Sequence, residues 1–222
     1  MIVQGAAASR RPDPPDTAGP PGRFPYHLWH EQIRSTPDMT AATDTTPVTS
    51  ARAEPDADAF RAAMGRFPTG VTLLTQGSGD DTAVMTLNSL TSVSLDPMLI
   101  LVSVKADGRM RPRISRAGSF AVSVLTAAQR GLAREFCRPD RCEGWAAMLR
   151  LAAEKGITGN AVLPAAEMSL ECVLDAEHEA GDHTLLIGRV VALHGGASEP
   201  DPLLFHQGRF GELPAVSDKE HP

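Results

Sequence analysis

Aromatic residues are scarce in this chain of 222 residues. Phe, Trp and Tyr make up 5% of it, with a single Tyr and two Trp, too few for the stacking platforms that bind single-stranded nucleic acids. The formal net charge of −6 also opposes binding to nucleic acids or anionic membranes, because both are negatively charged. We therefore expect neither nucleic acid nor membrane as a partner.

Cysteine is equally rare, with only Cys137, Cys142 and Cys172. A low, odd number argues against a disulfide framework and favours a reducing compartment. Cys137 and Cys142 lack the CxxC spacing, and no His stands at ligand spacing beside them, so we expect small buried side chains and no metal. No apolar run approaches the roughly 20 residues of a membrane helix. The sequence predicts a cytoplasmic protein.

Several motifs of nucleotide-binding and hydrolytic enzymes are missing. The chain has no GxGxxG and no GxxxxGK[ST], so it offers neither a dinucleotide-binding βαβ unit nor a P-loop. It has no GxSxG elbow for a serine nucleophile. No pair of Asp and Glu residues stands out as a general acid and base. The residues alone therefore predict a fold and a pocket, but no reaction.

The chain is expected to hold one folded domain between two tails. Residues 1–55 are rich in Pro, Ala and Thr without helical or strand periodicity, which predicts a disordered tail. Met39 opens a second leader-like stretch within it, and translation starting there is one hypothesis. The domain is expected over residues 56–213, followed by a C-terminal tail at 214–222.

Hydrophobic periodicity predicts a mainly β domain with a few helices. Helical spacing is expected over residues 56–67, 127–136 and 143–155. Alternating or β-branched runs predict strands at 71–75, 119–125, 167–175 and 183–193, with two or three more between 82 and 105 and a closing segment at 203–210. Strands and helices do not alternate regularly, so we predict a small antiparallel β-barrel of the α+β class rather than a doubly wound sheet.

The stretch from Thr82 to Lys105 is expected to form the centre of the site. Its apolar run Met98–Val102 predicts a completely buried strand. Polar side chains precede that run, and Thr86, Asn88 and Ser89 are suited to hydrogen-bond a heterocycle or a ribityl chain. The alternative is that they are ordinary strand and turn residues. The residues alone favour this second interpretation.

Residues 105–116 concentrate positive charge in an otherwise acidic chain. Five cations stand there against one acid, namely Lys105, Arg109, Arg111, Arg113 and Arg116. Such a group at a helix start suits a phosphate, but a solvated connection between strands has the same composition. His183 and His206 present a similar choice between lining a pocket and partial exposure in a turn.

Five segments, in this order, closely resemble the flavin reductase family, the small reductase components of two-component flavin-dependent monooxygenases. They read FRAAMGRFPTGVTLLT, AVMTLNSLTSVSLDPMLILVSV, GSFAVSVLTAAQRGLAREF, AGDHTLLIGRV and PLLFHQGRFGEL. The resemblance spans about Phe60 to Leu213 and is weakest at residues 141–166. It implies a split antiparallel β-barrel that binds FMN or FAD and forms a homodimer. It also implies that NADH or NADPH reduces the flavin, which then diffuses to a separate monooxygenase.

The same resemblance assigns site residues. It implies that the flavin ring runs along Thr82, Ala83, Val84, Met85 and Thr86, with hydrogen bonds from Asn88 and Ser89. Residues near the flavin tail and phosphates would be Ser103, Val104, Lys105, Arg109 and Met110, and Phe136 would be a further flavin contact. The nicotinamide nucleotide would lie near Phe205, His206, Gln207, Gly208 and His183. His183 is the one catalytic candidate, chiefly for positioning, because hydride transfer is chemistry of the two cofactors.

Two alternative functions remain at this point. One is a self-contained flavoprotein that keeps its flavin as a fixed prosthetic group. The other is a barrel that binds flavin or haem without turnover, acting as a carrier or sensor. The residue pattern is compatible with all three functions, since all three need the same pocket.

Overall fold

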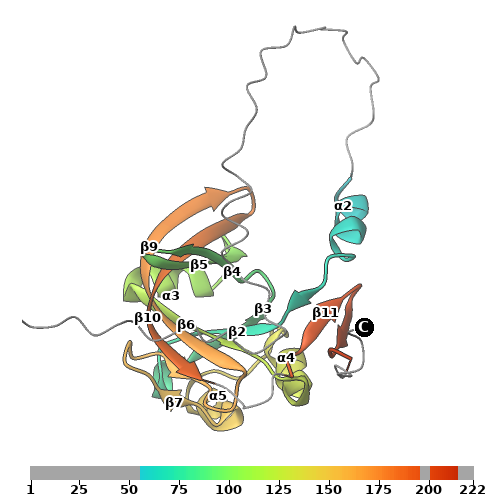
Figure 1. Cartoon of the computed structure of the whole chain (residues 1–222). Coiled ribbons are helices and arrows are strands. Elements are labelled where there is room, and N and C mark those ends of the chain that lie inside the picture. The colour runs from blue at the N-terminus through green and yellow to red at the C-terminus, as the bar shows by residue number, and fades with distance from the viewer. Residues whose placement is uncertain (1–55, 196–200, 215–222) are drawn as a thin grey trace, which may run out of the picture. The chain divides into compact units, whose positions relative to one another are not determined.

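The computed structural model of the chain describes residues 56–195 and 201–214 (Figure 1). The expected tail 1–55, with the alternative start at Met39, lies outside these ranges, as does the C-terminal tail beyond Pro214. The helices within them are α2 (Ala57–Met64), η1 (Gly79–Asp81), α3 (Met110–Ala117), η2 (Ala127–Gln129), α4 (Arg130–Phe136) and α5 (Gly144–Leu151). Among these described helices, none has the length and apolar character needed to cross a membrane.

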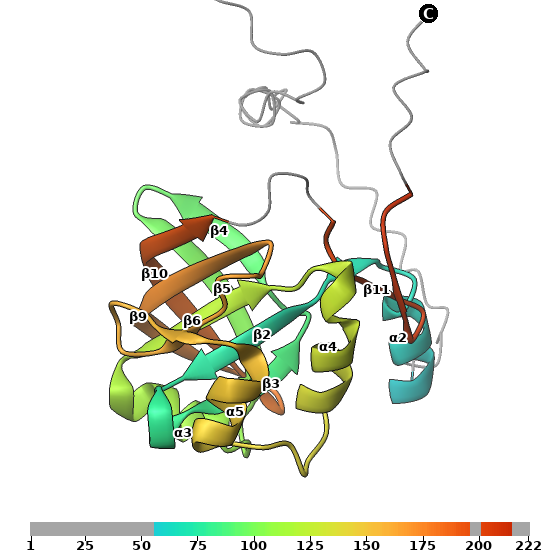
Figure 2. The same cartoon turned by 90° about the horizontal axis from the view of Figure 1, so that it is seen from below.

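A seven-stranded antiparallel sheet forms the body of the domain. Its strand order is β3-β2-β6-β9-β10-β5-β4. The bounds are β2 (Thr72–Gln76), β3 (Ala83–Leu87), β4 (Thr91–Leu95), β5 (Met98–Lys105), β6 (Ser119–Val124), β9 (Met168–Ala180) and β10 (His183–Gly195). The two edge strands β3 and β4 are joined by only three residues, so the sheet must curl until its edges approach each other. Figure 2 shows this curl, with β2 and β6 on one side and β4 and β5 on the other. The predicted split β-barrel is confirmed.

Two hydrophobic cores lie on the two faces of this sheet. The inner core fills the barrel with side chains from several strands and α3, including Leu74, Val102, Ile114, Phe120 and Leu186. The outer core lies between the sheet and the helices α4 and α5, and includes Leu73, Val84, Leu125, Phe136 and Leu151. Because β2 and β6 contact both cores, nearly all of their residues are buried, which explains their continuous β-branched and apolar sequence.

The strand predicted at Met98–Val102 is present, but the prediction that it is completely buried is wrong. In β5 only the alternate residues Ile100, Val102 and Val104 are buried, and Met98 is exposed. The inner face of β5 points into the barrel, but neither α4 nor α5 covers its outer face. An unbroken apolar run therefore marks here a strand with a partly exposed apolar face rather than a central buried one.

Two helical predictions also need correction. The helix expected over residues 143–155 ends at Leu151, because Ala152 takes a left-handed conformation with φ 46°. The chain then forms a small hairpin of β7 (Glu154–Lys155) and β8 (Ala161–Val162). The basic segment 105–116 is not simply a connection, since α3 begins within it at Met110. The helix forms because Met110 and Ile114, one turn apart, fill the inner core.

The cysteine prediction is correct for Cys172 alone. Cys172 is buried in the inner core, Cys142 is partly buried and Cys137 is exposed, and all three are free thiols. Burial raises the pKa of the Cys172 thiol to about 12, so it stays protonated at neutral pH. Cys137 is exposed because it follows Phe136, the last residue of α4, and lies outside the outer core.

Strand β9 carries a buried carboxylate, Glu171, which anchors the β7–β8 hairpin. Its side chain has no exposed surface. It accepts hydrogen bonds from the backbone N–H groups of Ile157 (3.0 Å) and Thr158 (2.7 Å) and from the Thr158 hydroxyl (2.6 Å). His194 Nε2 lies 2.7 Å from its Oε1. Burial alone would raise the pKa of Glu171, but these hydrogen bonds, those of Thr158 first, lower it below the ordinary value.

A second, smaller sheet joins the N-terminal helix to the end of the domain. It consists of β1 (Thr69–Gly70), β11 (Leu204–His206) and β12 (Arg209–Gly211) in the order β1-β11-β12. The turn between β11 and β12 has two left-handed residues, Gln207 and Gly208. The Gln207 N–H donates to the Gly65 carbonyl at 2.7 Å, so the closing segment packs against the end of α2.

Candidate functional site

Four of the five predicted ring-binding residues, 83–86, lie on β3, an edge strand of the large sheet, and Thr82 directly precedes it. The side chains of Thr82, Ala83 and Val84 are buried, and Val84 packs in the outer core beside Phe136. A ligand lying along this strand would therefore meet its backbone rather than these side chains. An edge strand suits that role, because its outer N–H and C=O groups have no neighbouring strand to pair with.

The residues after β3 connect it to the end of β5. The Ser89 hydroxyl accepts a hydrogen bond from the Ser103 N–H at 2.9 Å and donates to the Ser103 carbonyl at 3.1 Å. The Asn88 amide donates to the Thr69 hydroxyl at 3.2 Å. The Thr86 hydroxyl donates to the Ala133 carbonyl in α4 at 2.9 Å. The structure thus brings the predicted polar residues together, and it shows that each already holds a neighbouring segment in place.

The predicted phosphate residues differ in accessibility. Arg109 is exposed immediately before α3, where Nη1 lies 3.2 Å from Glu143 and Nη2 donates to the Pro139 carbonyl at 3.4 Å. Met110 and Val104, in contrast, are buried in the inner core, and Phe136 is fully buried in the outer one. Of the residues predicted near the flavin tail and phosphates, Lys105 and Arg109 present charged groups to solvent.

Sequence reasoning missed Arg141, in the segment between α4 and α5. Its Nε donates to the Val84 carbonyl on β3 at 2.5 Å, and its Nη1 donates to the Arg138 carbonyl at 3.0 Å. Burial, and then the positive charge of Arg109, lower the pKa of Arg141. Two guanidinium groups therefore lie near each other with one carboxylate, Glu143, between them. In the segment CRPDRCE, the spacing of the charged residues does not distinguish Arg141 from Arg138. The contact of Arg141 with β3 therefore could not be predicted from the sequence.

His183 lies at the first position of β10 and pairs in register with Lys105 at the last position of β5. Its Nδ1 hydrogen-bonds the Asp182 carboxylate at 2.8 Å, and this bond lowers the pKa of Asp182. The ring is partly exposed, which leaves Nε2 available to a ligand. The register of the sheet therefore places His183 beside Lys105.

Of the residues predicted around the nicotinamide nucleotide, Phe205 and Gly208 line a groove between α2, β1 and the start of β4. The groove has a volume of about 590 Å³, and its walls include Asn88, Ser89, Phe205 and Gly208 together with the apolar side chains of Met64 and Phe67. Phe205 stacks at a tilt on Phe210, with ring centroids 5.6 Å apart. His206 and Gln207 are exposed at the adjacent turn and are not among the lining residues.

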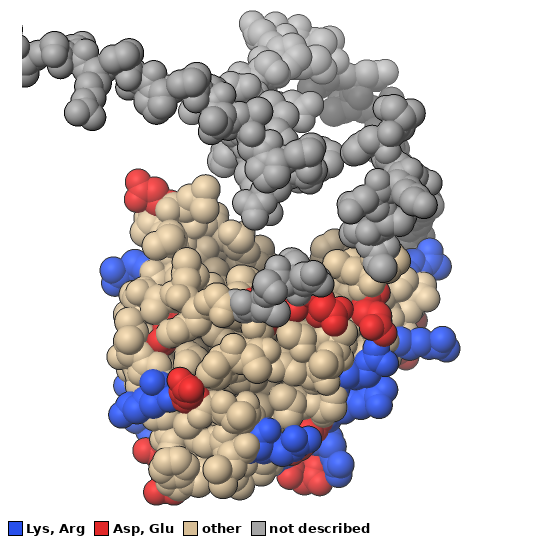
Figure 3. All heavy atoms as spheres, turned by 60° about the horizontal axis from the view of Figure 1, so that its bottom comes forward, with Lys and Arg blue, Asp and Glu red and all other residues tan. Residues whose placement is uncertain are grey.

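Charged side chains of both signs are interspersed on the surface of the domain. On the face in Figure 3, small groups of Lys and Arg stand beside Asp and Glu around a broad area that carries few charges. This face has no continuous basic area of the kind that follows a nucleic-acid backbone.

Comparison with known proteins places this fold and these residues in one family. The family described as the Flavin reductase like domain matches residues 64–214. The NADH-dependent FMN reductase AsuE2 of Streptomyces nodosus subsp. asukaensis is 44% identical over 160 residues, covering 72% of this chain and 86% of that protein. The NADH-dependent FAD reductase of Streptomyces globisporus is 36% identical over 163 residues, covering 72% and 87%.

Solved structures agree with the sequence relatives. BorF, the flavin reductase component of a bacterial two-component tryptophan halogenase, has a TM-score of 0.67 at 38% identity and covers 72% of this chain and 100% of its own. The styrene monooxygenase flavin reductase of Pseudomonas putida S12 has a TM-score of 0.62 at 34% identity, covering 71% and 99%. The resemblance in five sequence segments is thereby confirmed, and the chain belongs to the flavin reductase family.

Proposed function

We propose that this protein oxidises NADH, reduces FMN or FAD, and releases the reduced flavin to a separate monooxygenase. The observation that carries the proposal is the similarity to NADH-dependent reductases of both flavins over 72% of this chain. Reductase components of two-component systems among the structural neighbours support the monooxygenase partner. NADPH is a second candidate reductant.

Because NADH is a cytoplasmic reductant and all three cysteines are free thiols, we place the protein in the cytoplasm.

The edge strand β3 is the proposed seat of the flavin ring. Its outward backbone N–H groups would donate to the ring, where negative charge grows during reduction. Arg109 and Arg141 fit the phosphate end, because two guanidinium groups with one carboxylate leave a positive charge unmatched. The bound flavin and nicotinamide supply the hydride chemistry themselves. The protein contributes the alignment of the two rings and the exclusion of water.

His183 is proposed as a positioning residue for the nicotinamide nucleotide, through its free Nε2. The His183→Ala variant should raise the KM for NADH about fivefold, the equivalent of about 1 kcal/mol for one hydrogen bond, and leave the KM for flavin unchanged. Arg109→Gln is the matched counterpart and should raise the KM for flavin at least about tenfold, since a charge-assisted bond is lost. Steady-state kinetics of both variants measures this. Equal effects of either substitution on both substrates would contradict the assignment.

A homodimer is the proposed assembly, because apolar side chains of the described domain lie open to solvent. On α2 and the turn after it, Phe60, Met64 and Phe67 are 62%, 51% and 66% exposed. On the β4–β5 hairpin, Val93, Leu95 and Met98 are 50%, 80% and 50% exposed. Apolar surface of this extent is typical of protein interfaces. Sedimentation equilibrium at micromolar concentration measures the assembly, and a monomer there would overturn the proposal.

The rate of NADH oxidation with added free flavin separates this function from its alternatives. We expect the purified protein to turn over NADH in proportion to added FMN or FAD until saturation, and to lose its flavin on gel filtration. Activity that is complete without added flavin, with a pigment that survives dialysis, would instead establish a self-contained flavoprotein. Tight pigment binding without NADH or NADPH oxidation would establish a carrier or sensor.

A further inference from the structure

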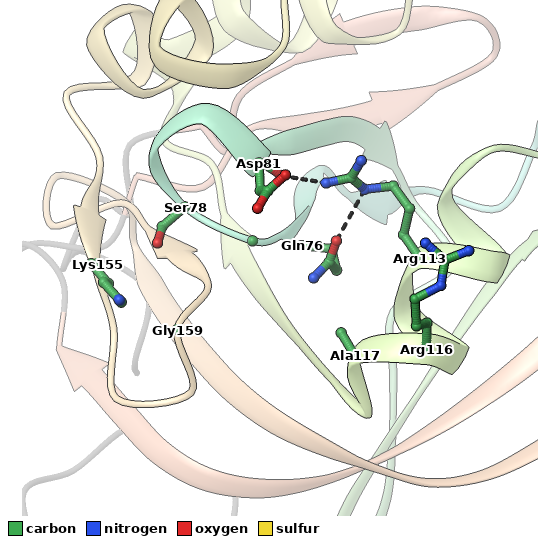
Figure 4. Close-up of a pocket in the computed structure, with 9 residues that line it drawn as sticks. Gln76, Ser78, Asp81, Arg113, Arg116, Ala117, Lys155 and Gly159 are labelled. Carbon is green, nitrogen blue, oxygen red and sulfur yellow. Dashed lines mark hydrogen bonds between the residues drawn. The ribbon is translucent and has the colours of Figure 1, made fainter.

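A cavity outside the predicted flavin residues lies between α3 and the β7–β8 hairpin. Its volume is about 430 Å³, within the range of small-molecule sites. Figure 4 shows that α3 forms one wall, the β7–β8 hairpin the opposite wall, and the loop after β2 lies between them. The side chains that matter for its chemistry are Gln76, Ser78, Asp81, Arg113, Arg116 and Lys155. The resemblance assigned a role to none of these six residues.

Positive charge dominates the lining of this cavity. Arg113 and Arg116 stand on α3, and Lys155 lies across the cavity on β7 (Figure 4). Asp81 is the single lining carboxylate, so the wall carries two more positive than negative charges. Within the described residues, none of the three cations forms an ion pair with a carboxylate, whereas Arg109, Arg111, Arg130, Arg138, Arg150 and Arg189 all do.

Arg113 is fixed in place without being neutralised. Its Nε donates to the Gln76 amide oxygen at 3.0 Å, and its Nη2 donates to the backbone carbonyl of Asp81. Both acceptors are uncharged, so the guanidinium keeps its full positive charge while its orientation is set. A guanidinium held in this way is prepared for a second, anionic partner, because no rotamer freedom remains to be lost when that partner binds.

We propose that this cavity binds a phosphate or diphosphate group. The planar guanidinium matches the oxygen geometry of phosphate, and Lys155 would add a point charge from the opposite wall. Neutral donors are also available, since the Gln76 side-chain nitrogen Nε2 is not engaged by Arg113, and the Ser78 hydroxyl makes no capping bond to η1. A dianion would offset the mutual repulsion of the three cations.

The position of the cavity relates it to the proposed flavin site. Arg109, Arg113 and Arg116 are spaced i, i+4 and i+7, which places them along one side of α3. Asp81, on the cavity wall, directly precedes Thr82 and the edge strand β3. The phosphate could therefore belong to a nucleotide that extends along α3 from the flavin site, or to a separate small molecule.

Titration calorimetry of the full chain with inorganic pyrophosphate, at constant ionic strength, tests the proposal without NADH or flavin. We expect saturable binding, weakened about tenfold or more by Arg116→Gln and by Lys155→Gln. Both side chains are exposed, so neither substitution should disturb folding. Arg66→Gln is the matched control, since it removes an exposed Arg on a different part of the surface. No binding, or an equal loss in all three variants, would overturn the proposal.

The same titration in saturating FMN and in saturating FAD identifies the source of the phosphate. If the cavity holds the adenylate end of a dinucleotide, FAD should displace pyrophosphate and FMN should not. If it is a separate site, neither flavin should change the pyrophosphate affinity. Competition by FMN and FAD alike, with no effect of Arg116→Gln or Lys155→Gln, would place the pyrophosphate in the flavin site and overturn the proposal. Because no turnover is measured, the result is independent of whether the protein reduces flavin.

Discussion

The Glu171→Ala variant is expected to lose about 3 to 5 kcal/mol of unfolding free energy, because three hydrogen-bond donors lose their acceptor at about 1 to 3 kcal/mol for each group left unsatisfied. Glu171 has no exposed surface and accepts bonds from Ile157, Thr158 and His194. Without its carboxylate, two backbone N–H groups and a hydroxyl lose the acceptor that the buried Glu171 side chain supplies. The β7–β8 hairpin should then detach from β9, and Lys155 would move with it.

Urea unfolding of the wild type, Glu171→Ala and Glu171→Gln measures this cost. Glu171→Gln keeps the shape and one acceptor oxygen, so it should lose less than the Ala variant. Since the hydrogen bonds lower the pKa of folded Glu171, its contribution to stability should be present at neutral pH and disappear as the pH falls through that lowered pKa. A loss below about 1 kcal/mol for the Ala variant, or an equal loss at neutral and strongly acidic pH, would contradict the role of this carboxylate.

Much of the sheet could be predicted from the sequence because its strands carry their own periodicity. Residues 119–125 and 183–193 were predicted as strands, and β6 and β10 occupy them. Helix α2 follows its prediction as well, with the Asp56 carboxylate accepting a hydrogen bond from the Ala59 N–H at 2.7 Å. In each case the local pattern and the tertiary packing favour the same structure, so the local signal is sufficient.

The sequence-based predictions are wrong where tertiary contacts determine the burial of a strand or the end of a helix. The alternation in 167–175 predicts a strand, but no alternation could show that β9 is buried on both faces over residues 169–172, including the carboxylate of Glu171. That burial depends on Ile157 and Thr158 of the β7–β8 hairpin, 14 and 13 positions before Glu171, and on His194, 23 positions after it. Helix α5 stops at Leu151 for the same reason, since residues 154–155 pair with 161–162. The window 143–155 does not contain residues 161–162, and the window 167–175 contains neither the hairpin nor His194.

The candidate site shows the same division. Pairing of β5 with β10 brings His183 beside Lys105, although 77 positions separate them in the chain. Their roles came from the family resemblance, and their adjacency came from the register of the sheet. Arg141 could not be found in either way, because its bond to the Val84 carbonyl depends on how the segment after α4 folds back onto β3. The cavity lined by Arg113, Arg116 and Lys155 likewise exists only through packing.

The Gly188→Ala variant is expected to lose about 3 kcal/mol, at the upper end of the cost of overpacking a core. Gly188 lies in β10 at a register shift against β9, and a Cβ built there would lie 2.5 Å from Phe120 Cζ and 2.9 Å from Cys172 Cβ. Phe120 is fully buried in the barrel and has no space to retreat. Even one methyl group should therefore force β10 away from β6 and β9 and weaken the pairing that places His183.

A second substitution tests whether the Phe120 ring is the cause. Phe120→Leu alone should cost about 1 to 2 kcal/mol, since it leaves a small cavity, but in the Gly188→Ala background it should restore part of the lost stability. Urea unfolding of all four proteins gives a coupling energy, expected at about 1 to 3 kcal/mol in the favourable direction. Gly70→Ala is the matched control, because a Cβ there meets no atom within 4 Å, and it should change stability by less than about 0.5 kcal/mol. Additive losses in the double variant would show that the ring is not what excludes a side chain at position 188.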